Sequence, residues 1–478
     1  MALTVSNIST LGLLRVLNQT GTEYNNILKR LSTGYRINRA ADDPAGLIAL
    51  NKIDSDLAAV NAAISNDRRT DAMLTVADGA LTEVTSLLTD IHRLAVASAS
   101  TAGLTASELA ANQAEIDSAI ASIDRLMRTT EFNGRRLLDG SLAIQVTSVG
   151  ANISDVHVYS RDPNTATGSG QTISVTLVDA ATLAAASGDA RLVANSASED
   201  TTIQIRGALG AEVIEISAGE NLSSIVAKIN EVSSLTGVVA SQAGGVETGA
   251  INLYSTDYGS DQFVKVTVLS GGTAYGSGND FQDINVSGTD AVVTVNGAAA
   301  SAQGNEVYFS AGGLSLSFTI GTGFSESSTE TFTVSDDGGA TFQLGTDTRT
   351  RVTIGIDGLY SQRLGTAALG YLSSLKSGGA ASLLNDPNQA AQIAKAALEQ
   401  VATVRGRLGA FQAYQVETSL SSMETLKEGL TAARSTIADT DYAVETANLN
   451  RQNVLMQAAI TLLGLTKQQH SSVLNLLM

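Results

Sequence analysis

The chain has 478 residues, a net charge of −18 and no cysteine, and 43% of its residues are hydrophobic. This length predicts several domains, and the missing cysteines exclude disulfides, thiolate metal sites and thiol nucleophiles. No apolar run reaches the ~18 residues of a membrane span, and the first residues lack the basic and apolar regions of a cleaved signal peptide.

The first predicted element is an amphipathic helix within residues 1–40. Apolar or small residues recur there in steps of three and four, which is the spacing of one helix face. The members of this stripe are Leu14, Leu17, Gly21, Tyr24, Leu28 and Leu31. A helix with such a stripe is marginal in water and needs a partner against which it can bury that face.

A long helix is predicted from Pro44 to about Ser100. Asp43 suits the N-cap, and proline suits the first helical position. A seam of apolar residues in steps of three and four follows, and further along it carries three aspartates, Asp67, Asp71 and Asp78. Because aspartates weaken a simple coiled coil, they indicate either more than one helical neighbour or polar contacts that fix the register.

Another helix is predicted after a break at residues 98–103. Thr105 and Glu108 have the spacing of a capping box, and the helical period ends near Phe132-Asn-Gly, which is a turn signal. The face expected to be buried consists of Leu109, Gln113, Ile116, Ile120, Ile123 and Met127.

Residues 140–345 change to a period of two, which is typical of strands. One helix is expected inside this region, from Asn221 to Ser233. Residues 141–350 carry 22 acidic and 6 basic side chains, whereas the rest of the chain carries 25 and 23. We expect one or two acidic, solvent-facing β-rich domains, split near residues 276–288, and no binding of nucleic acid. The clearest strands are at 173–178, 213–216, 292–295, 314–320 and 331–334.

The chain returns to helix at Asp386-Pro387, which repeats the earlier combination of N-cap and proline. The apolar phase of this helix slips between Phe411 and Val416, and such a slip alters the local winding. A break at residues 439–441 precedes the last helix. The stripe of that helix, again in steps of three and four, includes Met456, Ile460, Leu463, Leu474 and Leu477.

Helices at both ends of the sequence can enclose a common core only if they pair antiparallel. The predicted fold is therefore α+β and multi-domain, with long antiparallel coiled-coil-like helical rods and inserted β-rich outer domains. We expect residues 1–40 and 440–478 to form a terminal helical assembly domain. Residues 41–140 and 340–439 would form a helical rod domain with β-hairpins, and residues 141–339 the outer region.

The sequence contains no pattern typical of an enzyme. Its three histidines are scattered, and none is followed by glutamate, so the zinc-peptidase motif is missing. Nucleophile-elbow, phosphate-loop and dinucleotide-binding glycine patterns are missing as well. We therefore expect no catalytic activity, no cofactor and no metal ion.

Several motifs follow one another in a fixed order along the two helical ends. They are Arg30-Leu-Ser-Thr-Gly-Tyr-Arg-Ile-Asn-Arg-Ala-Ala-Asp-Asp-Pro-Ala-Gly46, residues 132–140, residues 408–410 and residues 439–443 with the helix that follows. This set resembles the bacterial flagellins over about residues 1–140 and 340–478. In the middle, residues 219–230 and 251–255 resemble the hook IN motif of flagellins and filament-cap proteins.

The resemblance implies a structural subunit that self-assembles into the bacterial flagellar filament for swimming. It also implies an extracellular protein that leaves the cell by the flagellar type III route, without a cleaved signal peptide. The implied partners are copies of the same chain, an export chaperone, the filament cap and the hook-junction proteins, with no membrane partner. The candidate self-assembly residues are Leu14, Leu17, Leu28, Leu31, Met456, Ile460, Leu463, Leu474 and Leu477.

One stretch departs from the family pattern. Flagellins detected by the innate immune receptor of animals carry Arg-x-Arg-Glu-Leu-Ala-Val, and the aligned stretch here is Asp90-Ile-His-Arg-Leu-Ala-Val96. Leu94 is kept, but Asp90 and His92 replace the arginines and Arg93 replaces the glutamate, which removes favourable charge contacts. We predict weak receptor activation, and full potency in a reporter-cell assay would contradict it.

Two other functions fit parts of the sequence. A hook–filament junction protein shares both helical ends and would differ in copy number, although residues 41–47 and the long last helix favour flagellin. The outer region could instead be an adhesin or another binding module displayed on the filament. Motility retained with attachment lost, after deletion of residues 141–340, would support that second alternative.

Overall fold

The computed structural model of the chain describes residues 8–477 apart from 101–102, 162–169, 192–196, 198, 243–249, 272–279, 282 and 368. The chain divides into two compact units. The first unit contains Met1–Asp71, Gln343–Thr348 and Gln412–Met478, and the second contains Ala72–Phe342 and Arg349–Phe411.

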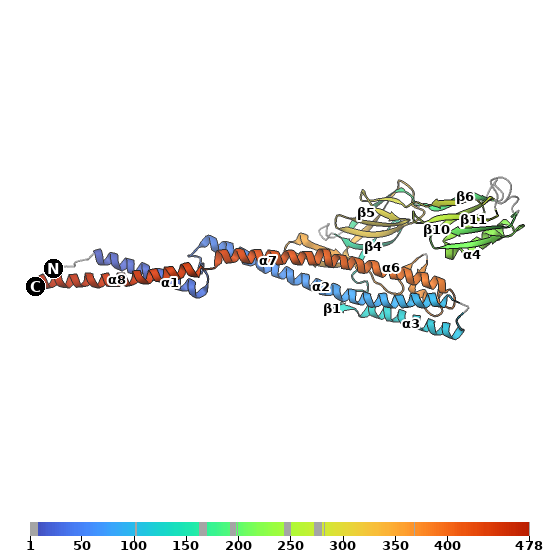
Figure 1. Ribbon diagram of the computed structural model, residues 1–478. Helices are drawn as coiled ribbons and strands as arrows, with labels where there is room; N and C mark the ends of the chain where they lie inside the picture. The colour runs from blue at the N-terminus through green and yellow to red at the C-terminus, as the bar shows by residue number, and fades with distance from the viewer. Residues whose placement is uncertain are drawn as a thin grey trace. The chain divides into compact units, whose positions relative to one another are not determined.

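The first unit is built from two antiparallel helix pairs. Helices α1 (Ile8–Thr33) and α8 (Tyr442–Leu477) lie side by side (Figure 1). The first part of α2 (Pro44–Ser98) pairs with α7 (Glu417–Ala438). Two ion pairs fix the direction of this second pair, because Asp54 bonds Arg434 at 2.6 Å and Arg68 bonds Glu424 at 2.9 Å. The expected antiparallel pairing of the two chain ends is confirmed within this unit.

Both predicted helix starts are confirmed by their caps. Asp43 accepts a hydrogen bond from the Gly46 amide at 2.9 Å, directly before α2. Asp386 accepts one from the Gln389 amide at 2.9 Å, directly before α6 (Pro387–Phe411). In each case an acceptor satisfies an orphan amide of the first turn, and the proline behind it has no amide to satisfy.

The predicted phase slip is a single π-helical segment, η4 (Gln412–Val416), which joins α6 to α7. Phe411 and Val416 are both buried although Val416 lies five positions after Phe411. An extra residue in one turn restores the apolar face that a regular helix would lose. The slip in the sequence is thus a real change of winding.

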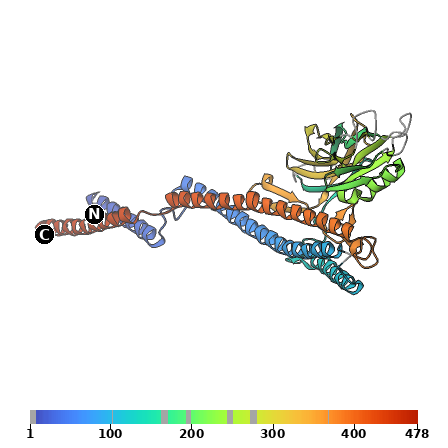
Figure 2. The ribbon, with the colours of Figure 1, turned by 45° about the vertical axis from the view of Figure 1, so that its right-hand side comes forward.

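Three helices pack together in the helical part of the second unit (Figure 2). They are the remainder of α2, α3 (Ala106–Thr129) and α6. The capping box of α3 is present, with both Thr105 and Glu108 bonded to each other's backbone. The buried faces have heptad spacing. They comprise Leu74, Ala77, Leu81, Val84, Leu88 and Ile91 on α2, Gln113, Ile116, Ile120, Ile123 and Met127 on α3, and Ala390, Ile393, Ala394, Ala397 and Val401 on α6.

Short strands and turns complete this bundle. A hairpin after α3 joins β1 (Glu131–Phe132) to β2 (Arg135–Arg136) through Asn133 and Gly134, which both have positive φ; such a turn suits the twist of a hairpin. Gln113, buried on α3, donates to the Leu375 carbonyl and accepts from the Leu383 amide, both at 2.8 Å. The connecting segment before α6 contains β22 (Gly365–Thr366), β23 (Gly370–Tyr371) and η3 (Leu372–Leu375).

A first β core consists of two antiparallel sheets around one cluster of buried residues. At its centre the rings of Phe318 and Phe332 meet edge to face, with centroids 5.9 Å apart. One sheet contains, in order, β15 (Ala298–Ala299), β14 (Val292–Val295), β5 (Gln171–Asp179), β19 (Thr329–Gly338) and β3 (Ile144–Thr147). The other contains β16 (Ser301–Gln303), β17 (Glu306–Ala311), β18 (Leu314–Ile320), β4 (Ile153–Arg161), β21 (Arg351–Ile354) and β20 (Ala340–Gln343), with η2 (Thr348–Thr350) before β21.

A second β core is inserted into the first. Helix α4 (Leu222–Glu231), which lies within the predicted helix 221–233 and is capped by Asn221, packs with α5 (Ser233–Thr236) on its sheets. One sheet contains β12 (Asp280–Phe281), β6 (Leu183–Arg191), β10 (Ala250–Tyr258) and β9 (Val238–Gln242). The other contains β13 (Ile284–Ser287), β11 (Phe263–Ser270), β7 (Thr201–Arg206) and β8 (Ala211–Ile216). The five strands predicted from the sequence lie within β5, β8, β14, β18 and β19.

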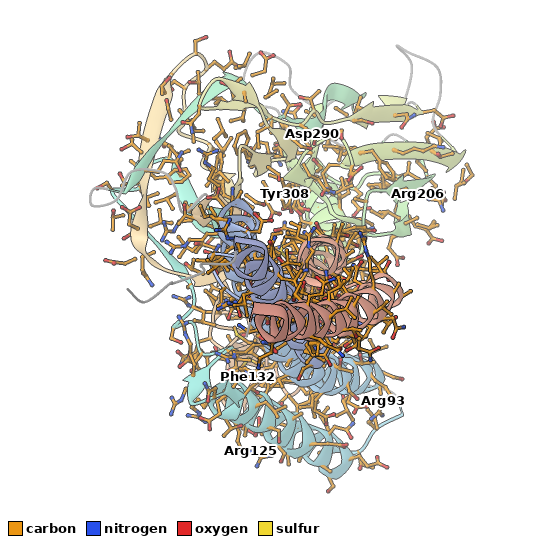
Figure 3. All side chains as sticks on the ribbon, turned by 90° about the vertical axis from the view of Figure 1, so that its left-hand side faces the viewer. Arg93, Arg125, Phe132, Arg206, Asp290 and Tyr308 are labelled. Carbon is orange, nitrogen blue, oxygen red and sulfur yellow. The ribbon has the colours of Figure 1, made fainter. Side chains whose placement is uncertain are left out.

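The two β cores meet at a tight junction. Thr182 and Thr289 form an isolated antiparallel bridge, and their hydroxyls lie 2.8 Å apart. Asp290 accepts from the Ser260 hydroxyl at 2.6 Å and from the Gly304 amide at 2.7 Å (Figure 3), and these bonds lower the pKa of its carboxyl. A side chain at Gly288 would collide with the Thr182 carbonyl. The point at which the chain leaves the first β core is therefore adjacent to the point at which it returns.

Candidate assembly surface

The α1–α8 pair has a narrow seam of small and apolar side chains. Thr20 and Ile27 on α1 and Ala459 on α8 are buried in it. Four of the predicted assembly residues, Leu17, Leu31, Met456 and Leu463, are half-buried. A seam with so few buried residues leaves much of each helix surface uncovered in a single chain.

Many of the remaining large apolar residues of these helices are exposed, whereas Leu13, Tyr24 and Leu449 are half-buried. Val454 keeps 65% of its surface accessible and Ile460 keeps 55%. Soluble chains expose single apolar residues routinely, but a run of them along paired helices marks an interaction surface. The exposed set is Leu11, Leu14, Val16 and Leu28 on α1, with Val454, Leu455, Ile460, Leu462 and Leu465 on α8. The side chains of Leu474 and Leu477 lie outside the described residues.

The base of this helix pair is fixed by backbone and ionic contacts. Gly34 ends α1 with φ +76°, and its carbonyl accepts from the Thr440 amide at 2.9 Å. Tyr35 forms a bridge with Asp439. Arg30 bonds the largely buried Glu445 at 3.0 Å. The two chain ends are thus tied together where the helices of the pair start and stop, and no helical or strand periodicity could have revealed these contacts.

Helix α7 also keeps much of its seam accessible. Ala438 is its one buried residue, although α7 carries an apolar stripe with helical spacing. The stripe residues Leu420, Met423, Leu430 and Ile437 are only half-buried. Like the terminal pair, α7 has an apolar face that one copy of the chain does not cover.

The aspartates predicted to interrupt the α2 seam make polar contacts with the returning chain. Asp71 accepts from Gln412 at 2.7 Å within the first unit, and Asp78 bonds Arg405 at 2.9 Å within the second. The expectation of register-fixing polar contacts is confirmed for these two. Asp67 differs, because it is fully buried and neither carboxyl oxygen has a hydrogen-bond partner among the described residues.

The stretch Asp90–Val96, which aligns with the pattern of receptor-detected flagellins, lies on α2 in the second unit. Asp90 and Arg93 are more than half exposed and pair with each other at 3.4 Å, and Arg93 projects from the helix (Figure 3). His92 is half-buried, and Leu94 is buried in the bundle. A charge pair within the helix thus occupies the exposed side of this stretch, and Leu94 is not available for contact with a partner.

A polar cluster attaches the six-stranded sheet to α6 inside the second unit. The Arg407 guanidinium lies 3.2 Å from the centroid of the Tyr159 ring, a cation–π contact. His157 bonds the Asp357 carboxylate through Nδ1 at 3.0 Å, and this hydrogen bond raises the pKa of the imidazole. Tyr308, on strand β17 of the same sheet (Figure 3), has its pKa raised by burial. These groups fix a sheet on a helix.

Neither a metal site nor a membrane-crossing helix is found in the described part of the chain. No three His, Cys, Asp or Glu side chains there gather in a way that could hold a metal ion. No helix among the same residues has the length and hydropathy needed to cross a membrane.

Comparisons with known proteins agree with this arrangement. Residues 5–143 match the bacterial flagellin N-terminal helical region, residues 391–477 the C-terminal helical region, and residues 202–257 the flagellin hook IN motif. The chain is 30% identical to B-type flagellin of Pseudomonas aeruginosa, over 100% of both chains. It is 27% identical to flagellin of Salmonella typhimurium, over 99% of both. A solved structure of FliC from Burkholderia pseudomallei covers 72% of this chain and 99% of its own, at 19% identity and a TM-score of 0.25.

Paired terminal helices with uncovered apolar faces, joined to β-rich insertions, define a structural protein that polymerises. The chain belongs to the bacterial flagellin family, and it is a structural subunit of the flagellar filament. The family is extracellular and structural. The motif matched at residues 202–257 confirms the resemblance of the middle region to the hook IN motif, and it spans α4 and strands of the second β core.

Proposed function

We propose that the subunit polymerises through the apolar faces that α1 and α8 leave exposed. The observation that carries this proposal is the row of accessible Leu, Ile and Val side chains on a helix pair whose own seam is narrow. Burial of such side chains stabilises an interface by about 25 cal/mol per Å² of apolar surface. This burial has to offset the translational, rotational and side-chain motion that is lost on assembly.

The predicted assembly residues then have two roles. Leu17, Leu31, Met456 and Leu463 hold the two helices of one subunit together. Leu14, Leu28 and Ile460 contact neighbouring copies, and Leu474 and Leu477 stay predicted assembly residues. The half-covered seam of α7 supports a second contact between copies.

The same proposal assigns a role to each domain and names the remaining partners. The terminal pair is the assembly domain, the α2–α3–α6–α7 helices are the rod domain, and the acidic β cores face solvent. The export chaperone, the filament cap and the hook-junction proteins are the proposed further partners, and the flagellar type III route is the proposed export route. Weak activation of the innate receptor stays a prediction, and the burial of Leu94 supports it.

Ile460→Asp tests the assembly surface directly. Because Ile460 is exposed in one chain, its replacement should leave the helix content and the thermal midpoint of the free subunit unchanged. In a filament the same carboxylate would be buried without a partner, so growth onto filament seeds should stop. Ile460→Leu is the control and should elongate seeds normally. Normal filaments from Ile460→Asp, seen by negative-stain microscopy, would refute the proposed surface.

A further inference from the structure

A short segment of the sequence between Phe342 and Arg349 is part of the first unit. Gln343–Thr348 belongs to the first unit, whereas the residues on both sides of it belong to the second. We call this segment the strap. Its Leu344 and Gly345 are buried, and the Gln343 side chain donates to the Gly345 and Asp347 carbonyls at 2.8 and 2.6 Å. The strap is thus an ordered turn rather than a loose linker.

A hydroxyl on α7 is bonded to the strap. Ser419, on α7, donates its hydroxyl proton to the Leu344 carbonyl. The Ser419 hydroxyl also interacts with the carboxyl group of Asp67 on α2, and this interaction lowers the pKa of that carboxyl group. A serine hydroxyl has a single proton to donate. Leu344 and Asp67 therefore compete for one donor.

Asp67 has no other polar partner in its surroundings. It is fully buried, and both carboxyl oxygens are without a hydrogen bond among the described residues. Burial is the larger effect and raises the pKa of this carboxyl to about 6. A carboxylate in such a place is unfavourable, whereas a neutral carboxyl is tolerated.

The charged groups around this site are engaged elsewhere or exposed. On α2, Arg68 is exposed and paired with Glu424 of α7, and Asp71 accepts from Gln412. Glu417 on α7 and Asp347 on the strap are exposed. The causes that shift the pKa of Asp67 are burial and Ser419, with no charged side chain among them.

We propose that Asp67, Ser419 and the strap form a proton-controlled latch. With the carboxyl protonated, Ser419 donates to the Leu344 carbonyl, and the strap stays closed. When the carboxyl loses its proton to solvent, the carboxylate is the stronger acceptor and takes the Ser419 proton. The strap then loses its bond to α7, and water reaches the buried charge.

The direction of the pH effect follows from the two states. The folded pKa of Asp67 lies above its ordinary value of 3.8, so the folded chain binds this proton more tightly than the unfolded chain does. Stability of the first unit should rise as the pH falls through about 6 towards 4, and the latch should be open above that window.

Hydrogen exchange of the full-length, unpolymerised chain tests the latch. After correction for the intrinsic pH dependence of exchange, the strap amides should exchange about fivefold faster at pH 7.5 than at pH 5, the effect expected for one lost hydrogen bond. Asp67→Asn, which is neutral at both pH values, should keep the slow exchange throughout. Ser419→Ala should exchange fast at both.

The control Asp56→Asn removes an exposed acid of the same helix and should keep the wild-type response to pH. Equal strap exchange at both pH values in the wild type would overturn the proposal. A pH response that survives in Asp67→Asn would overturn it as well. If Asp67→Asn does not fold, Ser419→Ala decides the question, because slow exchange at pH 5 in that variant contradicts the shared hydroxyl.

Discussion

Leu463→Asp is expected to abolish filament growth and to separate α1 from α8 within a single subunit. Leu463 lies half-buried in the seam of that pair, so a charge there faces apolar side chains of the same chain. An unpaired buried charge costs about 3–5 kcal/mol. This raises the concentration needed for polymerisation on the order of 10²-fold or more. Seeded elongation and hydrogen exchange of the terminal helices measure the two effects.

The matched control is Leu463→Met, which keeps volume and apolar character and should cost less than about 1.5 kcal/mol. Comparison with Ile460→Asp separates the two roles of the surface, because that variant should fail to polymerise while its helix pair stays protected. Filaments of Leu463→Asp at wild-type concentration would contradict the account of the seam.

Removal of the whole second β core is expected to leave a folded subunit that still polymerises. Thr182 and Thr289 face each other across an antiparallel bridge, so replacing residues 183–288 by Asn-Gly creates a two-residue hairpin turn between them. Asp290 loses its bonds to Ser260, and Tyr258 no longer packs on the first core, so that core should melt at a lower temperature. Elongation of seeds should continue, because the apolar faces of α1 and α8 are unchanged.

A second deletion provides the contrast. Removing residues 171–288 also removes β5, which lies at the centre of the five-stranded sheet. The first core should then fail to fold, as seen by loss of near-UV circular dichroism from its aromatic residues. If the 183–288 deletion behaves like the 171–288 deletion, the two β cores are one cooperative unit and the nested description is wrong.

Local signals in the sequence predicted the helices well. A cap such as Asp43 or Asp386 followed by proline acts through the first turn alone, so it can be read without knowledge of the fold. The slip between Phe411 and Val416 could also be read, because both residues are buried and their spacing records the extra residue of η4. The alternating patterns at residues 292–295 and 314–320 are equally local signals, and these segments form β14 and β18.

Contacts between distant segments could not be predicted in the same way. The nesting of the β cores depends on the bridge between Thr182 and Thr289, and two threonines in turn-rich sequence give no sign of pairing. The partners of Asp71 and Asp78 lie more than three hundred residues away. Asp67 has the same seam spacing as these two, and its isolation depends on a strap whose position only the fold reveals.

The assembly surface was partly accessible from periodicity. Steps of three and four identified the apolar stripes but not which members one chain would cover, because steps such as Leu17 to Gly21 and Leu17 to Thr20 fit a helix equally well. The structure buries Thr20, Ile27 and Ala459, which are smaller or offset by one position from the predicted stripe. Small residues at these points let the helices approach closely and turn the larger side chains outward.

The hydrogen bond between Gly34 and Thr440 has a consequence for chains whose synthesis stops early. The helix pair at the base of the subunit needs both the first and the last part of the polypeptide, and Arg30 reaches Glu445 only when translation has passed that codon. A product of premature termination has α1 but no α8, so the seam of the terminal pair and the Arg30–Glu445 ion pair cannot form. The terminal helix pair therefore forms only in molecules that contain both the first and the last part of the polypeptide.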